Sequence, residues 1–110
     1  MPSNDNQRFE FPNEGSRDLF RALLALESIE DCENFFRDLC TIQELKSITE
    51  RWEIAKLVTE NVPYRVISLK TGASSTTIAR VAHWVNYGKG GYQKACKLRT
   101  EQPENAVLSE

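Results

Sequence analysis

The sequence predicts an all-α fold in a single small domain. Apolar residues recur at spacings of three and four along most of the chain, which is the period of an amphipathic helix rather than of a strand. Residues that can cap a helix stand just before these stretches. With 110 residues, of which 40% are hydrophobic and 27% charged, the chain has the composition of one folded soluble domain with a modest core.

We expect this helical domain to span residues 16–99. Residues 1–15 form a polar stretch without the apolar segment of a secretory signal, and we interpret them as a flexible N-terminal arm. Residues 100–110 are interpreted as a flexible tail. No apolar run approaches the roughly 18 residues that a membrane span requires, so no membrane partner is expected.

The first helix is expected over residues 17–27, with Ser16 as its cap and Asp18 in its first turn. This helix is apolar on nearly every side, through Leu19, Phe20, Leu23, Leu24 and Leu26 with two alanines between them. A helix of this kind is not stable on the surface of a monomer, so either the rest of the domain or a second subunit should cover it.

Ser28 is expected to open the second helix, whose buried stripe would be Cys32, Phe35, Phe36 and Leu39. Thr41 and Glu44 then form the sequence pattern of a capping box, in which each side chain binds the other residue's backbone amide. A long third helix should follow to about Glu60, with Leu45, Ile48, Trp52 and Ala55 at helical spacing.

Two further helices are expected over residues 64–83, separated only by Thr71, Gly72 and Ala73. Pro63 suits the start of the first of them, and Gly72 can adopt the positive φ that so tight a turn requires. Ser74 or Ser75 would cap the second. This spacing is typical of a helix-turn-helix. Its expected core contacts are Val66 or Ile67, Leu69, Ala73, Ile78 and Val81. A last helix is expected over residues 92–99.

The distribution of charge favours a polyanionic partner, although the chain as a whole has a net charge of −2. Residues 61–100 contain seven basic side chains and no acidic one, whereas the rest of the chain holds the other seven basic residues and all sixteen acidic ones. Such asymmetry is typical of a chain with one half that faces nucleic acid.

The second helix of the pair presents side chains that can read DNA. Its expected exposed face consists of Ser75, Thr76, Ala79, Arg80 and His83, with Ser74 at the cap and Thr77 near the edge. Arginine can pair with guanine, hydroxyls can contact bases or phosphates, and small side chains let the helix approach the major groove. Arg65, Lys70 and Lys89 flank this face as candidate phosphate contacts.

These residues also resemble a known family. The segments at 40–44, 72–80, 85–88 and 91–92, with the signatures GASxTTIxRV and VNYGxxGY, are similar to the Trp repressor superfamily and most similar to its YerC/YecD branch. Val85 stands where the family pattern has leucine. The resemblance covers about residues 16–98 and implies an all-helical, intertwined homodimer that binds operator DNA.

The resemblance also concerns an effector. In Trp repressor itself, tryptophan lies between two arginines, and Arg51 and Arg80 match these positions. The family's recognition-helix arginine is followed by glycine, which leaves room for the indole, but here Val81 follows Arg80. The branched side chain argues against tryptophan as corepressor, so no cofactor is expected. The alternative interpretation of Arg51 is a surface ion pair with Glu50 or Glu53.

Other classes of protein fit the sequence less well. An enzyme is not expected, because the chain has one histidine and neither a recognisable nucleophile–base pair nor a phosphate-binding loop. Three cysteines without ligand spacing predict no metal site and suit reduced thiols in the cytoplasm. Trp52 and Trp84 are interpreted as core or dimer contacts.

We therefore expect a dimeric, sequence-specific transcriptional regulator. A repressor acting by occlusion of a palindromic operator is favoured, since so small a dimer has no activation domain. The alternative is an all-helical interaction module whose basic half binds an acidic protein.

Overall fold

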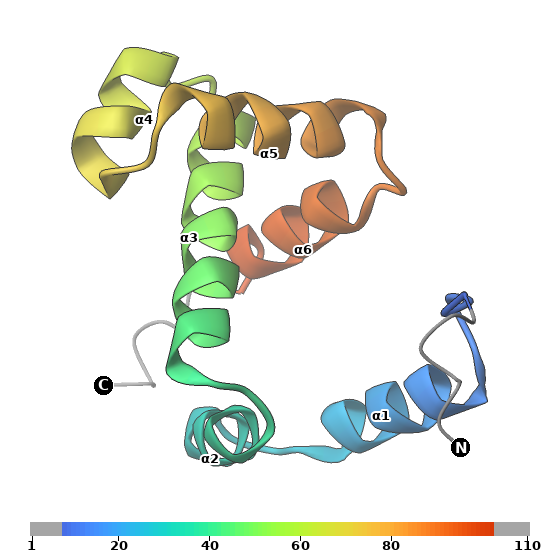
Figure 1. The fold of residues 1–110 in the computed structure, drawn as a ribbon. Coiled ribbons are helices and arrows are strands. Elements are labelled where there is room, and N and C mark those ends of the chain that lie inside the picture. Colours follow the sequence, from blue (N-terminus) through green and yellow to red (C-terminus); the bar gives the residue numbers. More distant parts are fainter. Residues whose placement is uncertain (1–7, 103–110) are drawn as a thin grey trace. The chain divides into compact units, whose positions relative to one another are not determined.

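Figure 1 shows the computed structural model of the chain, in which residues 8–102 are described. Over those residues the structure has six helices and no strand, which confirms the all-α prediction. The expectations for residues 1–7 and 103–110, which hold much of the predicted arm and tail, lie outside the described part. No helix within residues 8–102 is long and apolar enough to span a membrane.

The chain divides into two compact units, Met1–Asp38 and Leu39–Glu110. The first contains α1 (Glu14–Ala25) and nearly all of α2 (Ile29–Leu39), and the second contains α3 (Ile42–Thr59), α4 (Tyr64–Thr71), α5 (Ser75–Tyr87) and α6 (Gly91–Thr100). These bounds lie within a few residues of the predicted ones for every helix.

The start of α1 corrects the predicted cap. The N-cap is Asn13, and Ser16 is the third residue of the helix. The Asn13 side chain accepts a hydrogen bond from the Ser16 amide at 2.7 Å, while the Ser16 hydroxyl accepts one from the Asn13 amide at 2.9 Å. Asparagine caps helices as well as serine does, and this reciprocal pair satisfies two amides at once. The helix therefore begins about one turn earlier than Ser16 predicted.

The second helix begins as predicted but does not bury the predicted stripe. The Ser28 hydroxyl accepts a hydrogen bond from the Asp31 amide at 3.0 Å, which confirms Ser28 as the cap. Phe35 and Phe36 pack edge to face and are half-buried, whereas Cys32 and Leu39 are exposed. Neither α1 nor α2 contains a buried residue, so the predicted stripe of α2 is not buried within this chain. For α1, a second subunit stays as the predicted cover.

In the second unit, α3 is the element against which α4, α5 and α6 all pack (Figure 1). The capping box at its start is confirmed, because the Thr41 amide donates to the Glu44 carboxylate at 2.8 Å and the Glu44 amide donates to the Thr41 hydroxyl at 3.1 Å. The helix ends at Thr59, and just after its C-cap Glu60 the chain reverses at Asn61, whose φ is 62°. The Val62 amide donates back to the Leu57 carbonyl at 3.0 Å.

One fully buried isoleucine from each of three helices fixes their packing: Ile54 from α3, Ile67 from α4 and Ile78 from α5. Removing such a side chain from water contributes about 1.5–3 kcal/mol. The remaining core residues of this cluster are Ala55, Ala73, Val81 and Val85. The core thus lies between α3 and the α4–α5 pair, and it fixes the orientation of α5 relative to α3.

Most of the predicted contacts of the helix pair are confirmed, but Leu69 is wrong. Ile67, Ala73, Ile78 and Val81 are buried, whereas the Leu69 side chain is 76% exposed. Two residues correspond to about 200° around a helix, so Leu69 must point away from the core once Ile67 points into it.

Candidate nucleic-acid interface

The turn between α4 and α5 is held by side chains of α4. Gly72 ends α4 in the left-handed region, with a φ of 79°, and its amide donates to the Ser68 carbonyl at 2.8 Å. The Ser68 hydroxyl donates to the Ala73 carbonyl at 2.9 Å, and the Ala73 amide donates to the Thr71 hydroxyl at 3.1 Å. These bonds satisfy the turn's backbone groups and fix the direction in which α5 leaves the turn.

The first residues of α5 are ordered by its cap, which is Ser74 rather than Ser75. The Ser74 side chain accepts a hydrogen bond from the Thr77 amide at 3.2 Å, and its hydroxyl donates to the Thr77 hydroxyl at 3.1 Å. Ser75 and Thr76 are exposed and make no side-chain hydrogen bond to a described residue. Their hydroxyls are therefore available to an outside partner.

The two sides of α5 differ sharply. Ile78, Val81, Ala82 and Val85 are buried. The predicted outer face is exposed throughout, and it comprises Ser75, Thr76, Ala79, Arg80 and His83, with Thr77 half-buried at its edge. The buried side anchors the helix to α3, so the outer face projects small hydroxyls and one guanidinium from a rigid support. Contact of these residues with DNA stays a prediction.

The flanking basic residues are also exposed. Arg65 and Lys70 lie on α4, and Lys89 lies in the loop before α6. Neither these three side chains nor Arg80 makes an ion pair with any residue between 8 and 102. Because no acidic residue occurs between residues 61 and 100, their charge is not neutralised locally. The exposed face of α5 therefore carries the unpaired guanidinium of Arg80, and further unpaired cations stand on α4 and in the loop before α6.

Arg51 and Arg80, which match the effector-site arginines of the family, lie at the same cavity. They line one cavity of about 450 Å³ between α3, α5 and α6, together with Ser47, Glu50, Thr77, Val81, Trp84 and Tyr92. Arg51 makes no ion pair with Glu50 or Glu53, so the surface-pair interpretation was wrong. Val81 is only 4% exposed, so its side chain fills space at the wall next to Arg80.

The sequence analysis missed the aromatic character of this region. Trp84 is 54% exposed and is therefore not a core residue of this chain. The His83 ring lies 4.9 Å from the Trp84 ring and 5.3 Å from the Tyr87 ring, measured between centroids. Tyr92 reaches the cavity from α6. The spacing of 83, 84 and 87 along one helix was the signal available, since residues three and four apart share a face.

An all-helical fold in which a short capped helix projects hydroxyls and an arginine from a packed support is typical of small DNA-binding regulators. The chain belongs to the Trp repressor protein family, whose model matches residues 14–100.

Relatives and solved structures agree with this assignment. The chain is 44% identical to the uncharacterized protein YerC of Bacillus subtilis (strain 168) over 77 residues, which are 70% of this chain and 74% of YerC. A TrpR-like protein from Eubacterium eligens ATCC 27750 superposes with a TM-score of 0.77 at 38% identity, over 81% of this chain and 92% of that one. A crystal structure from Staphylococcus aureus, described as a candidate Trp repressor, gives 0.76 at 31% identity, over 91% and 96%.

Proposed function

We propose that this chain is a sequence-specific transcriptional regulator in which α4, the turn at Gly72 and α5 form a helix-turn-helix. The observation that carries the proposal is the exposed face of α5, which has small hydroxyl side chains and Arg80 on a helix anchored by Ile78. Small side chains allow a helix to lie deep in the major groove, where arginine and hydroxyls can bind base edges.

The roles of the side chains follow from their places. Thr76 and Arg80 read bases or hold the helix at a phosphate, with Ser75, Ala79 and His83 along the same face. Ser74 and Thr77 order the first turn of α5 through their hydrogen bonds. At this point both also contact the sugar-phosphate backbone of the DNA. Arg65, Lys70 and Lys89 bind phosphates and position the helix without reading sequence.

The regulator acts as an intertwined homodimer in the cytoplasm, with residues 16–99 as its DNA-binding domain and 1–15 and 100–110 as flanking segments. The absence of any buried residue in α1 and α2 supports a dimer, because those helices need an apolar partner. A two-fold dimer binds a palindrome with half-sites about one helical turn apart. Occupation of such an operator represses transcription by occlusion.

Free tryptophan is not the corepressor in this proposal. Arg51 and Arg80 line the cavity that would receive it, but Val81 stands in the wall beside Arg80 and the chain's own Trp84 lines the same space. The branched Val81 side chain thus takes up space at the wall beside Arg80 that a glycine would leave free for an indole. DNA binding without added ligand is expected.

The test is DNA binding by the full chain across a salt series, with and without excess unrelated duplex. Neutralising several phosphates should make the logarithm of the affinity fall steeply and linearly with the logarithm of the salt concentration. Bulk DNA should compete only weakly with a selected operator. If a protein partner is retained in the presence of excess DNA while no duplex binds, the basic half serves an acidic protein instead.

A further inference from the structure

The chain has a single histidine, His83, and it lies on the outer face of α5. Thr76, Arg80 and His83 are exposed and follow one another at spacings of four and three residues, so they share one side of the helix. The His83 ring contacts the rings of Trp84 and Tyr87, with centroids 4.9 and 5.3 Å away, which limits the orientations of the imidazole. The imidazole is therefore presented to an outside partner on the same face as the side chains proposed to read DNA.

The place of His83 along α5 suits a contact with the DNA backbone better than one with a base. A helix rises about 1.5 Å per residue, so His83 lies about 10 Å further along the axis than Thr76. The first residues of a recognition helix contact base edges, and the major groove is about 12 Å wide. With Thr76 at a base, His83 therefore reaches the phosphates that border the groove.

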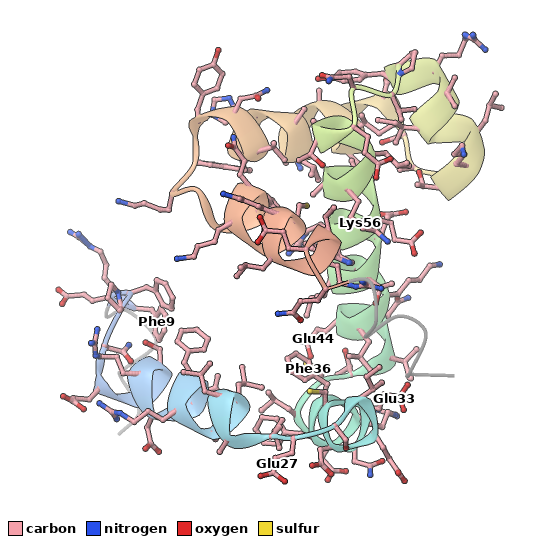
Figure 2. All side chains as sticks on the ribbon, turned by 180° about the vertical axis from the view of Figure 1, so that it is seen from behind. Phe9, Glu27, Glu33, Phe36, Glu44 and Lys56 are labelled. Atoms are coloured by element: carbon pink, nitrogen blue, oxygen red, sulfur yellow. The ribbon has the colours of Figure 1, made fainter. Side chains whose placement is uncertain are left out.

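The part of the chain that carries His83 has no negative side chain of its own. Residues 61–100, which contain α4, α5 and α6, include no aspartate or glutamate. The carboxylates labelled in Figure 2 belong to other segments, such as Glu33 to α2 and Glu44 to the first turn of α3. His83 makes no ion pair with any residue between 8 and 102. A positive charge on the imidazole is thus left for an outside anion.

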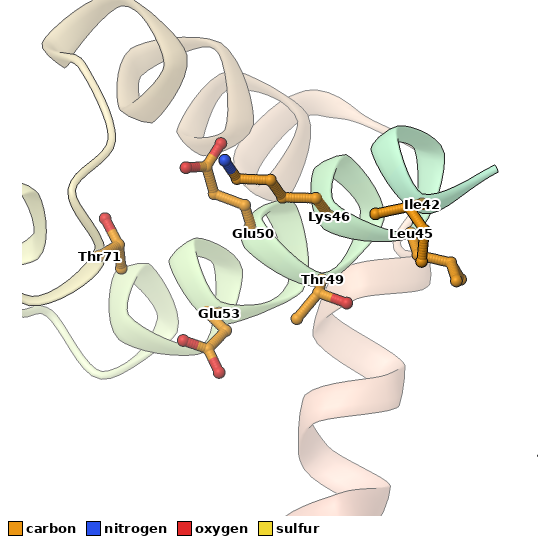
Figure 3. A pocket seen from close by; sticks show the side chains of 7 residues that line it. All are labelled: Ile42, Leu45, Lys46, Thr49, Glu50, Glu53 and Thr71. Carbon is orange, nitrogen blue, oxygen red and sulfur yellow. The ribbon is translucent and has the colours of Figure 1, made fainter. Parts of the chain in front are cut away.

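Three helices pack against α5 and bring ionisable groups to it. From α3, Glu50 and Arg51 line the cavity to which Arg80 and Trp84 contribute from α5, so this carboxylate shares its cavity with two guanidiniums. Glu50 and Glu53 also line a second cavity on α3, to which α5 contributes no residue (Figure 3). The ionisable groups of α4, α6 and the loop before α6 are basic side chains, phenols and one thiol, among them Arg65, Lys70, Lys89, Tyr92 and Lys94.

We propose that His83 binds a DNA phosphate as an imidazolium, so that DNA binding by this chain is coupled to the uptake of a proton. The inference rests on the proposed function and adds pH as a regulator of that same face. Histidine is the side chain whose charge ordinarily changes between pH 5 and 8, and the chain has only this one. A phosphate favours the charged form. The affinity for DNA is therefore highest at low pH and falls as the pH rises.

The test is the affinity of the full chain for two duplexes, one selected from a random pool and one of unrelated sequence, at pH 6 and at pH 8. An exposed ion pair contributes about threefold in affinity, so a dimer with two of them should bind about tenfold more tightly at pH 6. Both duplexes should show this change, because a phosphate contact carries no sequence information. The salt slope at pH 6 should be steeper by about one unit per subunit.

Two variants assign the effect to His83. His83→Gln keeps a polar side chain but cannot take up a proton in this pH range, so lowering the pH should neither raise its affinity nor steepen its salt slope. His83→Arg is charged at both pH values and should bind as tightly at pH 8 as at pH 6. Helix content measured by circular dichroism should be that of the wild type in both variants.

The outcomes separate this coupling from the proposed function. A response to pH that His83→Gln retains would overturn the role of His83 while DNA binding stands. A response that is lost in His83→Gln, but is not accompanied by a steeper salt slope in the wild type at pH 6, would overturn the phosphate contact. Binding of no duplex by the wild type at either pH would overturn the proposed function itself.

Discussion

Gly72 is the position at which the α4–α5 geometry can be tested by adding a single methyl group. Its φ is +79°, and a Cβ built there meets no heavy atom within 4 Å. The effect of Gly72→Ala is therefore conformational rather than steric. An alanine in the left-handed region costs about 1–2 kcal/mol, so we expect the free energy of unfolding to fall by about that amount.

Substitutions at Gly91 and Gly88 separate the effect of backbone strain from that of steric crowding. Gly91 also has open space around its position, but its φ is not in the left-handed region and it is the first residue of α6. Gly91→Ala should be neutral or stabilise the protein by up to about 1 kcal/mol. Gly88 is the opposite case, since a Cβ there would lie 2.5 Å from the Trp84 carbonyl oxygen. Gly88→Ala should therefore destabilise through a backbone clash.

Urea unfolding followed by circular dichroism, at one fixed protein concentration because a dimer's stability depends on it, gives the three differences. Gly72→Asn should recover part of the loss of Gly72→Ala, because asparagine tolerates the left-handed region better than alanine. If Gly72→Ala is as stable as Gly91→Ala, the chain does not turn with a positive φ at this point. The geometry inferred for α5 would then have to be abandoned.

Three further outcomes are expected. Thr41→Ala should lower the free energy of unfolding by about 1 kcal/mol in the same assay, because the capping box of α3 is lost; an unchanged value would mean that the box contributes nothing. Ser68→Ala should lower the free energy of unfolding by about 0.5–1.5 kcal/mol, because its hydrogen bond to the Ala73 carbonyl is lost. It should also weaken DNA binding, and unchanged binding would mean that the turn keeps its shape without that bond. Added tryptophan should not tighten DNA binding measurably in the wild type, and any response should be confined to Val81→Gly. A tenfold gain in the wild type would refute the assignment of Val81.

Local signals in the sequence predicted the helices well. Thr41 with Glu44 and Ser28 with Asp31 bind as expected, because a cap depends only on residues three apart. The prediction of Ser16 as the cap was wrong because Asn13, three residues earlier, can also cap this helix. The period of the apolar residues does not distinguish between the two caps. Leu69 failed because an eight-residue helix carries too few apolar positions to define its buried side.

Features that depend on tertiary packing were less predictable. That Arg51 and Arg80 share a cavity was implied only by family resemblance, since the two residues lie on different helices. The places of Trp84 and Tyr92 in the same cavity could not be inferred, because helical spacing shows which face a residue occupies but not which neighbour that face meets. The ring contacts of Phe11 with Phe9 and Phe20 were missed, because Phe9 and Phe11 lie in a stretch whose composition is polar overall.

The central claim is that the exposed face of α5 reads DNA, and the most direct measurement is the sequence preference of variants selected from a random duplex pool. The wild type should enrich a palindrome with half-sites about one helical turn apart. Thr76→Ala and Arg80→Ala should change the preferred bases, each losing about 1–3 kcal/mol of discrimination at a position. Lys70→Ala and Lys89→Ala should select the wild-type sequence with lower affinity and a salt slope flatter by about one unit per lost contact. Enrichment of no sequence by the wild type, or of one unaltered sequence by all four variants, would contradict the claim.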